Sequence, residues 1–228
     1  MTAPNMVAVD AKPMMKALCF SAHGKPAVSV LSMMDVPRPV TAPAGCVLVK
    51  VMAAALNPID AIRVEGGLKL LRKEAAFPAV LGYDLAGVIE SVGEGVTGFS
   101  VGDEIAARMQ NEPHPGSIAE FALVEARTLA KKPNGVSFTD AASIGLAGET
   151  ALQALRKVAV EEGSKVFISG GAGGVGTLGI QIAKLLGAST VATTASPGDK
   201  TELCKSLGAD VVVNYREQNF EEVLSGYE

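Results

Sequence analysis

The chain has 228 residues, 48% of them hydrophobic and 19% charged, and its formal net charge is −4 at pH 7. This length allows one large domain or two small ones, and the composition is that of an ordinary globular protein rather than a disordered one. The charged residues are scattered and form no basic patch, so we expect no nucleic-acid partner. No run of about 18 apolar residues occurs, so we expect no membrane-spanning segment.

Three cysteines, Cys19, Cys46 and Cys204, lie far apart in the chain and show no C-x-x-C spacing. They indicate neither a disulfide framework nor a zinc cage, so a reducing, cytoplasmic location is expected. The first 13 residues contain neither arginine nor the apolar core of a signal peptide. We therefore expect residues 1–15 to form a flexible N-terminal extension.

The sequence pattern of the next part of the chain is typical of a β domain. Short β-prone runs alternate with glycine and proline turns, and no helical period is sustained, which is typical of a small barrel or a partly open β domain. Strands are predicted over residues 16–21, 28–33, 46–54, 85–92 and 117–124.

Two helical regions interrupt this pattern. The first is predicted over residues 58–64. The second begins at Thr139-Asp140, a predicted N-cap, and continues with breaks near Gly145 and Gly148. This second region connects the β domain to the rest of the chain, so we place a domain boundary near residue 145.

A glycine-rich turn follows the β-prone run at residues 165–168. Gly171, Gly173 and Gly176 fit the pattern G-x-G-x-x-G, in which the first glycine permits a tight turn, the second lets the backbone approach a pyrophosphate, and the third lets a helix pack on a strand. The pattern alone is weak, because glycine-rich turns also occur in loops that bind nothing. The cofactor-binding residues predicted in this turn are Gly171, Ala172, Gly173, Gly174, Val175 and Gly176.

The residues after the turn supply the context that the pattern needs. Apolar side chains recur at helical spacing from Val175 to Leu186, and Gly187 marks the end of that helix. A strand over residues 190–194, a helix over 199–207 and a strand over 211–214 come next. This β-α-β-α-β order predicts half of a doubly wound dinucleotide-binding fold.

Four motifs occur in a fixed order: Leu56-Asn57-Pro58-Ile59-Asp60, Leu81-Gly82-Tyr83-Asp84, Gly102-Asp103, and the stretch from Ser169 to Gly176. With them the chain resembles the medium-chain dehydrogenase/reductase superfamily, and more closely its zinc-free quinone oxidoreductase (zeta-crystallin-like) branch, which includes alkenal and enone reductases. The resemblance implies an α/β protein with a GroES-like β-barrel catalytic domain over residues 16–145 and a partial Rossmann domain over 146–228. It also implies reduction of quinones or α,β-unsaturated carbonyls (enals and enones) by NADPH.

Zinc-dependent members of this superfamily carry a cysteine where this chain has Asn57, and Gly-His-Glu where it has Gly82-Tyr83-Asp84. The four-cysteine loop that binds structural zinc in such members is missing as well. Neither a catalytic nor a structural set of zinc ligands can be assembled from these residues. We therefore expect no metal site.

The end of the second predicted Rossmann strand indicates the choice of cofactor. A bare ribose 2′-hydroxyl favours an acidic residue about 20 positions past the glycines, and the stretch from Thr193 to Ser196 offers none. A 2′-phosphate favours a cation, which Lys200 supplies. By resemblance, Ser196, Lys200 and Tyr215 hold this phosphate, so NADPH is the expected cofactor. The alternative for Lys200 is a solvated helix lysine.

The resemblance also implies roles near the reacting atoms. Asn57 and Tyr83 would face the nicotinamide and the substrate, Asp60 would support the loop, and Thr150 would reach the cofactor. Hydride transfer needs aligned reactants and stabilisation of developing oxyanion charge. Structural alternatives stay open: Asn57 as a turn residue before Pro58, Asp60 as a helix cap, and Tyr83 as a core ring.

The predicted Rossmann part has only three strands, whereas a doubly wound sheet has about six. We therefore expect a C-terminally truncated product with an unpaired sheet edge that invites association. The alternative function is a truncated or non-catalytic protein that binds a nucleotide or a partner on the same fold. Because family members commonly pair Rossmann edges, a homodimer through that edge is a further expectation.

Overall fold

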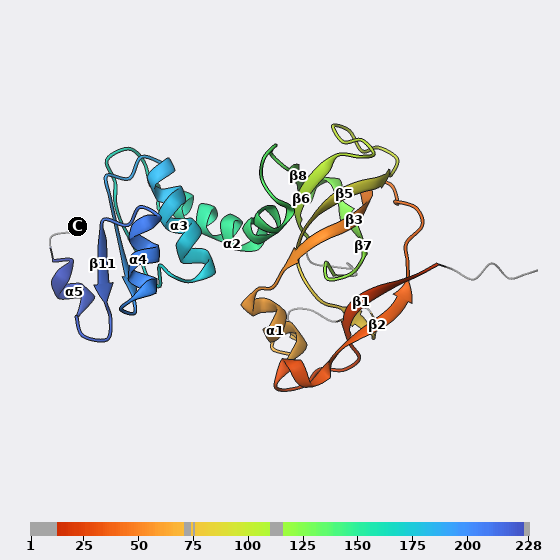
Figure 1. Cartoon of the computed structure of the whole chain (residues 1–228), viewed down its shortest axis with the longest axis horizontal. Helices are drawn as coiled ribbons and strands as arrows, with labels where there is room; N and C mark the ends of the chain where they lie inside the picture. The colour runs from red at the N-terminus through yellow and green to blue at the C-terminus, as the bar shows by residue number, and fades with distance from the viewer. Residues whose placement is uncertain (1–12, 71–73, 75, 110–115, 226–228) are drawn as a thin grey trace, which may run out of the picture. The chain divides into compact units, whose positions relative to one another are not determined.

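The computed structural model describes residues 13–70, 74, 76–109 and 116–225. Residues 1–12 of the predicted extension therefore lie outside the described residues. The chain divides into two compact units, Met1–Ser143 and Ile144–Glu228 (Figure 1). Among the described residues, no helix is long and apolar enough to cross a membrane.

The first unit is built from two sheets. A five-stranded antiparallel sheet has the order β7-β3-β5-β6-β8, and a three-stranded sheet has the order β2-β1-β4. The strands are β1 (Met14–Phe20), β2 (Leu31–Pro37), β3 (Cys46–Ala55), β4 (Ala79–Val80), β5 (Asp84–Val92), β6 (Glu104–Arg108), β7 (Phe121–Glu125) and β8 (Leu129–Lys131). The unit also contains α1 (Pro58–Val64) and two 3₁₀ turns, η1 (Ala27–Val30) and η2 (Ala126–Thr128).

Backbone hydrogen bonds join the two sheets at residues 117–120. The N–H of Leu18 in β1 donates to the carbonyl of Ile118 at 2.9 Å, and the N–H of Val51 in β3 donates to the carbonyl of Glu120 at 3.0 Å. The described strands therefore form two linked sheets, so of the two forms predicted, a small barrel or a partly open β domain, the structure shows the partly open one. The predicted α/β class is confirmed.

Buried apolar side chains hold the larger sheet together. Val47 and Val49 of β3 are fully buried and pack with Leu85 and Ile89 of β5. Removing such side chains from water is the main favourable term in folding. Two register shifts in the pairing of β3 with β5 mark irregularities of the kind that bend a strand, and they lie before the end of β3, which leads to Asn57.

Three differences from the predicted strands have local causes. The strand predicted over residues 28–33 is wrong at its start, because the N–H and the hydroxyl of Ser29 both donate to the Pro26 carbonyl and close η1. The ladder of β7 begins at Phe121 rather than at residue 117. Strands β4, β6 and β8 were not predicted, because runs this short show little alternation of apolar and polar residues.

The second unit contains a parallel three-stranded sheet with the order β11-β10-β9 (Figure 1). Its elements are β9 (Lys165–Ile168), α3 (Gly174–Leu185), β10 (Thr190–Ala195), α4 (Asp199–Ser206), β11 (Val211–Asn214) and α5 (Phe220–Val223). Ile180 of α3 and Cys204 of α4 belong to one core cluster with Val191. A second cluster joins Ala192 to Leu224. The predicted β-α-β-α-β order is confirmed.

Helix α2 (Phe138–Lys157) is continuous, so the break predicted near Gly145 and Gly148 is wrong. Gly148 faces Leu178 of α3, where an added β-carbon would make an ordinary van der Waals contact at 3.6 Å. A glycine inside a helix costs only about 1 kcal/mol, which the remaining turns of a 20-residue helix outweigh, so it does not end the helix.

The start of α2 also differs from the prediction. Ser137 Oγ accepts a hydrogen bond from the Asp140 N–H at 3.1 Å. A side-chain oxygen that binds an otherwise unpaired N–H of the first turn is what defines an N-cap. Ser137 therefore caps α2, and the predicted cap at Thr139-Asp140 is wrong.

We predict that Ser137→Ala lowers the free energy of unfolding by about 1 kcal/mol, because an N–H at the start of α2 loses its acceptor. Ser143→Ala is the matched control, since the Ser143 hydroxyl donates to the Asp140 carbonyl inside the helix. Urea unfolding followed by circular dichroism measures both variants. Equal stabilities of the two variants would contradict the assignment of the cap.

Candidate functional site

Asn57 joins strand β3 to helix α1. Its backbone is extended, with φ −128° and ψ 156°, and Pro58 begins the helix, where a missing N–H is tolerated. The Asn57 N–H donates to Asp60 Oδ2 at 2.7 Å, and the Asp60 N–H donates to the Asn57 carbonyl at 2.9 Å. Asp60 therefore fixes the backbone of Asn57 from the first turn of α1, as the acidic residue of a capping box does.

A second carboxylate holds the side chain of Asn57. Asn57 Nδ2 donates to Asp84 Oδ2 at 2.8 Å, and Asp84, the first residue of β5, is 1% exposed. Asn57 itself is half-buried. The structure thus joins the predicted residues Asn57 and Asp60 to Asp84, for which the sequence predicted no role.

Tyr83 precedes Asp84 and is buried. Its side chain belongs to the core, with 1% of the residue exposed, and its backbone carbonyl accepts from the Met109 N–H at 2.7 Å. The guanidinium carbon of Arg63 lies 5.9 Å from the centre of the Tyr83 ring. Such burial agrees with the structural alternative of a core ring, and the role of Tyr83 towards a substrate stays a prediction.

Arg63 and Glu74 form a buried ion pair that the sequence did not reveal. Arg63 Nε donates to Glu74 Oε1 at 2.9 Å, and Nη2 donates to Oε2 at 2.7 Å. Arg63 Nη1 donates to the Val80 carbonyl at 3.0 Å. Burial disfavours the charge, but the hydrogen bonds and the charge of Glu74 outweigh it and raise the pKa of Arg63. The pair ties α1 to the segment that leads to β4.

The carboxyl group of Asp60 is nearly inaccessible to water. Its Oδ1 atom has no hydrogen-bond partner among the described residues. Burial raises the pKa of Asp60 and the charge of Asp84 raises it further, although the hydrogen bond from the Asn57 N–H acts in the opposite direction. Ionisation of one of the two carboxyl groups around Asn57 therefore makes ionisation of the other less favourable.

The glycine turn of the second unit is held by β10. The N–H of Gly170 donates to Thr194 Oγ1 at 2.9 Å, and the N–H of Gly171 donates to the Thr194 carbonyl at 3.0 Å. A β-carbon on Gly176 would collide with the backbone of Gly170 and Gly171, so helix and turn touch only because Gly176 has no side chain. The helix is thus packed closely against the turn that follows β9.

The amide groups at the start of α3 precede its first backbone hydrogen bond, which runs from the Thr177 N–H to the Gly173 carbonyl at 2.9 Å. The N–H groups of a first helical turn have no acceptor within their helix, and such groups bind phosphate. In this chain they belong to Gly174, Val175 and Gly176. This arrangement can hold a pyrophosphate.

Ser196 and Tyr215 lie at the same edge of the sheet, just past the carboxyl ends of two neighbouring strands. Ser196 follows β10 and Tyr215 follows β11, and the last residues of these parallel strands, Ala195 and Asn214, are register partners. The glycine turn follows β9, which also runs parallel to β10, so it leaves the same carboxyl edge. Lys200 lies exposed in the first turn of α4. In open α/β sheets, ligands bind at the carboxyl edge.

Thr150 lies on α2. Its hydroxyl donates to the Leu146 carbonyl at 2.7 Å, one turn earlier in the same helix. No hydrogen bond between Thr150 and the glycine turn is present in the part of the chain that the structure describes. The predicted contact of Thr150 with the cofactor stays a prediction.

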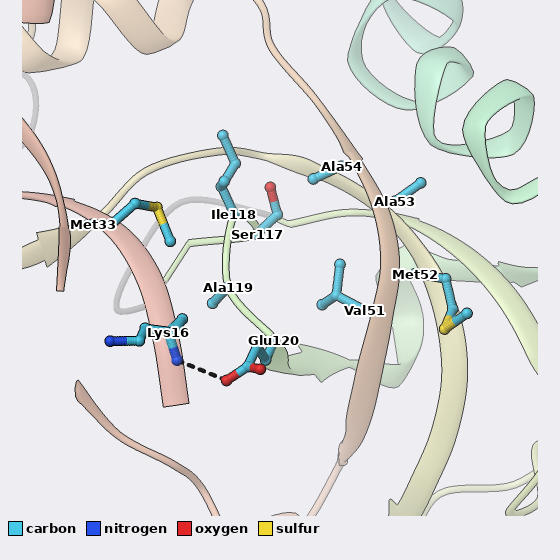
Figure 2. A pocket seen from close by; sticks show the side chains of 10 residues that line it. All are labelled: Lys16, Met33, Val51, Met52, Ala53, Ala54, Ser117, Ile118, Ala119 and Glu120. Atoms are coloured by element: carbon cyan, nitrogen blue, oxygen red, sulfur yellow. Dashed lines mark hydrogen bonds between the residues drawn. The ribbon is translucent and has the colours of Figure 1, made fainter. Parts of the chain in front are cut away.

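A pocket of about 310 Å³ lies in the first unit (Figure 2). Most of its lining is apolar. At one end the Lys16 backbone N–H donates to the Glu120 carboxylate at 2.7 Å, an interaction drawn as a dashed line in Figure 2. The lining residues are Lys16, Met33, Val51, Met52, Ala53, Ala54, Ser117, Ile118, Ala119 and Glu120. None of the predicted catalytic residues lines this pocket.

No group of three or more histidine, cysteine, aspartate or glutamate side chains in the described residues could hold a metal ion. Cys19, Cys46 and Cys204 are free thiols. Burial raises the pKa of the Cys19 and Cys204 thiols, which favours their neutral form.

Two protein-family models match the chain. The model of the alcohol dehydrogenase GroES-like domain matches residues 43–134, and the model described as zinc-binding dehydrogenase matches residues 174–227. The matches fall on the β unit and on the glycine-turn unit, in that order.

Two curated plant proteins and one solved structure are similar to the chain. A 2-methylene-furan-3-one reductase from Solanum lycopersicum is 45% identical over 183 residues, which are 78% of this chain and 46% of the relative. An NADPH-dependent alkenal/one oxidoreductase from Arabidopsis thaliana, described as chloroplastic, is 43% identical over 188 residues, 80% of this chain and 48% of the relative. The quinone oxidoreductase from Coxiella burnetii superposes with a TM-score of 0.81 at 38% identity, covering 92% of this chain and 65% of that one. The chain spans about half the length of these curated relatives.

We predict that Arg63→Met lowers the free energy of unfolding by about 3–5 kcal/mol, because it leaves the Glu74 carboxylate buried without its partner. The control is Arg127→Met, which removes an exposed arginine from its surface pair with Glu125 and should cost about 1 kcal/mol or less. Urea unfolding compares the two variants. Equal losses would contradict the distinction between a buried and a surface pair.

We predict that the stability of the chain, relative to an Asp60→Asn variant, falls as pH rises above about 4, the ordinary pKa of aspartate. The pKa of Asp60 is raised in the folded state, mainly by burial, so the folded chain holds a proton that the unfolded chain has released. The stability difference should level off above the raised pKa. Urea unfolding at a series of pH values measures it, and parallel profiles of the two proteins would refute the shift.

Proposed function

Because the chain belongs to the quinone oxidoreductase-like branch of the medium-chain dehydrogenase/reductase superfamily, we propose that it serves as an NADPH-dependent oxidoreductase. Its substrates would be quinones or α,β-unsaturated carbonyls, which the names of its relatives include. The observation that carries the proposal is the carboxyl edge of the β11-β10-β9 sheet, where a glycine turn, a helix start and a lysine occur and no acidic residue ends β10.

The residues of that edge fit a dinucleotide. The first-turn amides of α3, at Gly174, Val175 and Gly176, would bind the pyrophosphate. Ser196, Lys200 and Tyr215 would hold the ribose 2′-phosphate, because Lys200 offers a cation and the other two offer hydroxyl groups. The predicted contacts of Gly171, Ala172, Gly173 and Thr150 with the cofactor belong to the same proposal.

When bound, NADPH supplies the hydride, which adds to a carbon made electrophilic by conjugation to a carbonyl. The protein then has to align the reactants and stabilise the developing oxyanion. We assign the alignment to Asn57, whose backbone is held by Asp60 and whose side chain is held by Asp84. We assign Tyr83, which is buried, to the same site. No step requires a metal ion.

Three further assignments concern the domain bounds, the oligomeric state and the compartment. We propose that the GroES-like domain covers residues 16–145 and the Rossmann part covers residues 146–228, which agrees with the positions of the two family-model matches. A homodimer through the edge of the Rossmann sheet is proposed because β9 pairs only with β10 among the described strands. A reducing compartment such as the cytoplasm is proposed from the three free cysteines.

The function is tested by following the oxidation of NADPH with a small panel of quinones and enals. The loss of nicotinamide absorbance should depend on both the protein and the acceptor, and zinc chelators should leave the rate unchanged. NADPH binding without turnover of any acceptor would favour a non-catalytic nucleotide-binding protein. Absence of both binding and turnover would overturn the proposal.

We predict that the chain binds NADPH more tightly than NADH, and that Lys200→Ala weakens NADPH binding about tenfold while NADH binding changes little, because only NADPH carries the 2′-phosphate. Lys205→Ala is the matched control, since Lys205 lies in the last turn of the same helix and pairs with Glu202. Titration of nicotinamide fluorescence measures the six dissociation constants of the parent and the two variants for NADPH and NADH. Equal affinities of the parent chain for the two cofactors would refute the assignment.

A further inference from the structure

Two carboxylates from different elements hold one half-buried asparagine. Asp60 of α1 accepts from the backbone N–H of Asn57 at 2.7 Å, and Asp84 of β5 accepts from its side chain at 2.8 Å. Both carboxylates are almost completely buried. Asp84 lies 27 residues from Asn57 in the chain, so only the folded β unit brings the two together.

This arrangement costs stability. Removing a carboxylate from water is unfavourable, and the burial of Asp60 and the charge of Asp84 both oppose ionisation of Asp60. One carboxylate would suffice to cap the start of α1, because Asp60 already binds the Asn57 N–H. Asp84 is not needed for that cap, so its hydrogen bond from the Asn57 side chain has a different effect.

The chemistry of the amide explains that effect. A side-chain amide has a donor end and an acceptor end that are nearly equal in size, so packing alone does not select its orientation. An ionised carboxylate only accepts hydrogen bonds, so the nitrogen of the Asn57 amide must face Asp84 and its oxygen must face elsewhere. A neutral partner that can both donate and accept would allow both orientations.

We propose that Asp84 is a positioning residue that fixes the orientation of the Asn57 amide and so determines which of its atoms meets the cofactor or the substrate. The part of this statement that concerns ligands rests on the proposed function. The part that concerns orientation does not, because it follows from the Asn57–Asp84 hydrogen bond alone. Asp84 acts through Asn57 and need not touch the reacting atoms.

The first experiment observes the amide directly. Nuclear magnetic resonance of the ¹⁵N-labelled chain gives the side-chain N–H pair of Asn57, identified by its loss in Asn57→Ala. Asp84→Asn should shift this pair and speed its exchange with water, because the charged acceptor is gone. Asp35→Asn is the control, since Asp35 is an exposed carboxylate of the same unit that pairs with Lys16 at 2.8 Å. It should leave the Asn57 signals unchanged.

The second experiment measures turnover with NADPH and a quinone. Asp84→Asn should lower kcat about tenfold, as expected for loss of a charge-assisted hydrogen bond, with little change in the KM for NADPH. Asp84→Glu keeps the charge and should recover part of the rate. Thermal melting identifies any variant that fails to fold, and if Asp84→Asn does not fold, the comparison is made on Asp84→Glu, whose longer side chain should still shift the Asn57 signals.

The outcomes separate the two proposals. Unchanged Asn57 signals in a folded Asp84→Asn variant overturn the positioning role, as does an unchanged kcat in an active protein. Shifted signals together with no turnover in any protein, the parent included, support the orientation of the amide and refute the proposed oxidoreductase function. A loss of rate in proportion to a loss of thermal stability, with unchanged Asn57 signals, would show a structural role only.

Discussion

The part of the first unit around Asn57 depends on hydrogen bonds that stabilise buried charged side chains. Asp60, Arg63 and Asp84 are all removed from water, and Glu74 is nearly so. Each buried ion costs several kcal/mol of solvation unless hydrogen bonds replace the lost water. Arg63 meets this need with Glu74 and the Val80 carbonyl, while Asp60 and Asp84 meet part of it with Asn57. The connection from β3 into α1 is consequently held by polar contacts as well as by packing.

In the second unit, neutral hydrogen bonds rather than buried charges hold the glycine turn. The backbone N–H groups of this turn must stay accessible to a ligand, so few side chains can lie beside them. Thr194 of β10 binds the Gly170 and Gly171 amides, while the Thr193 hydroxyl donates to the Ile168 carbonyl at the end of β9. These neutral contacts shape the turn without placing negative charge beside a phosphate. A carboxylate there would repel the 2′-phosphate that Lys200 is proposed to bind.

Local patterns allowed part of this structure to be predicted, and long-range contacts explain the rest. Helix α1 follows from Pro58 and its neighbours, and β9, β10 and β11 follow from short β-prone runs between glycine turns. Gly145 and Gly148 misled the prediction of α2, because glycine weakens a helix but does not end one of 20 residues. The Asn57–Asp84 bond and the Arg63–Glu74 pair join residues 27 and 11 positions apart, and no local period encodes such contacts.

The central claim is that the carboxyl edge of the β11-β10-β9 sheet binds NADPH, and nuclear magnetic resonance tests it most directly. In a titration of the ¹⁵N-labelled chain with NADPH, the account predicts progressive shifts of the backbone amides from Gly171 to Gly176 and of Ser196 and Lys200. NADH should shift the glycine turn but affect Ser196 and Lys200 less. Shifts confined to other parts of the chain, or no shifts at saturating NADPH, would contradict the account.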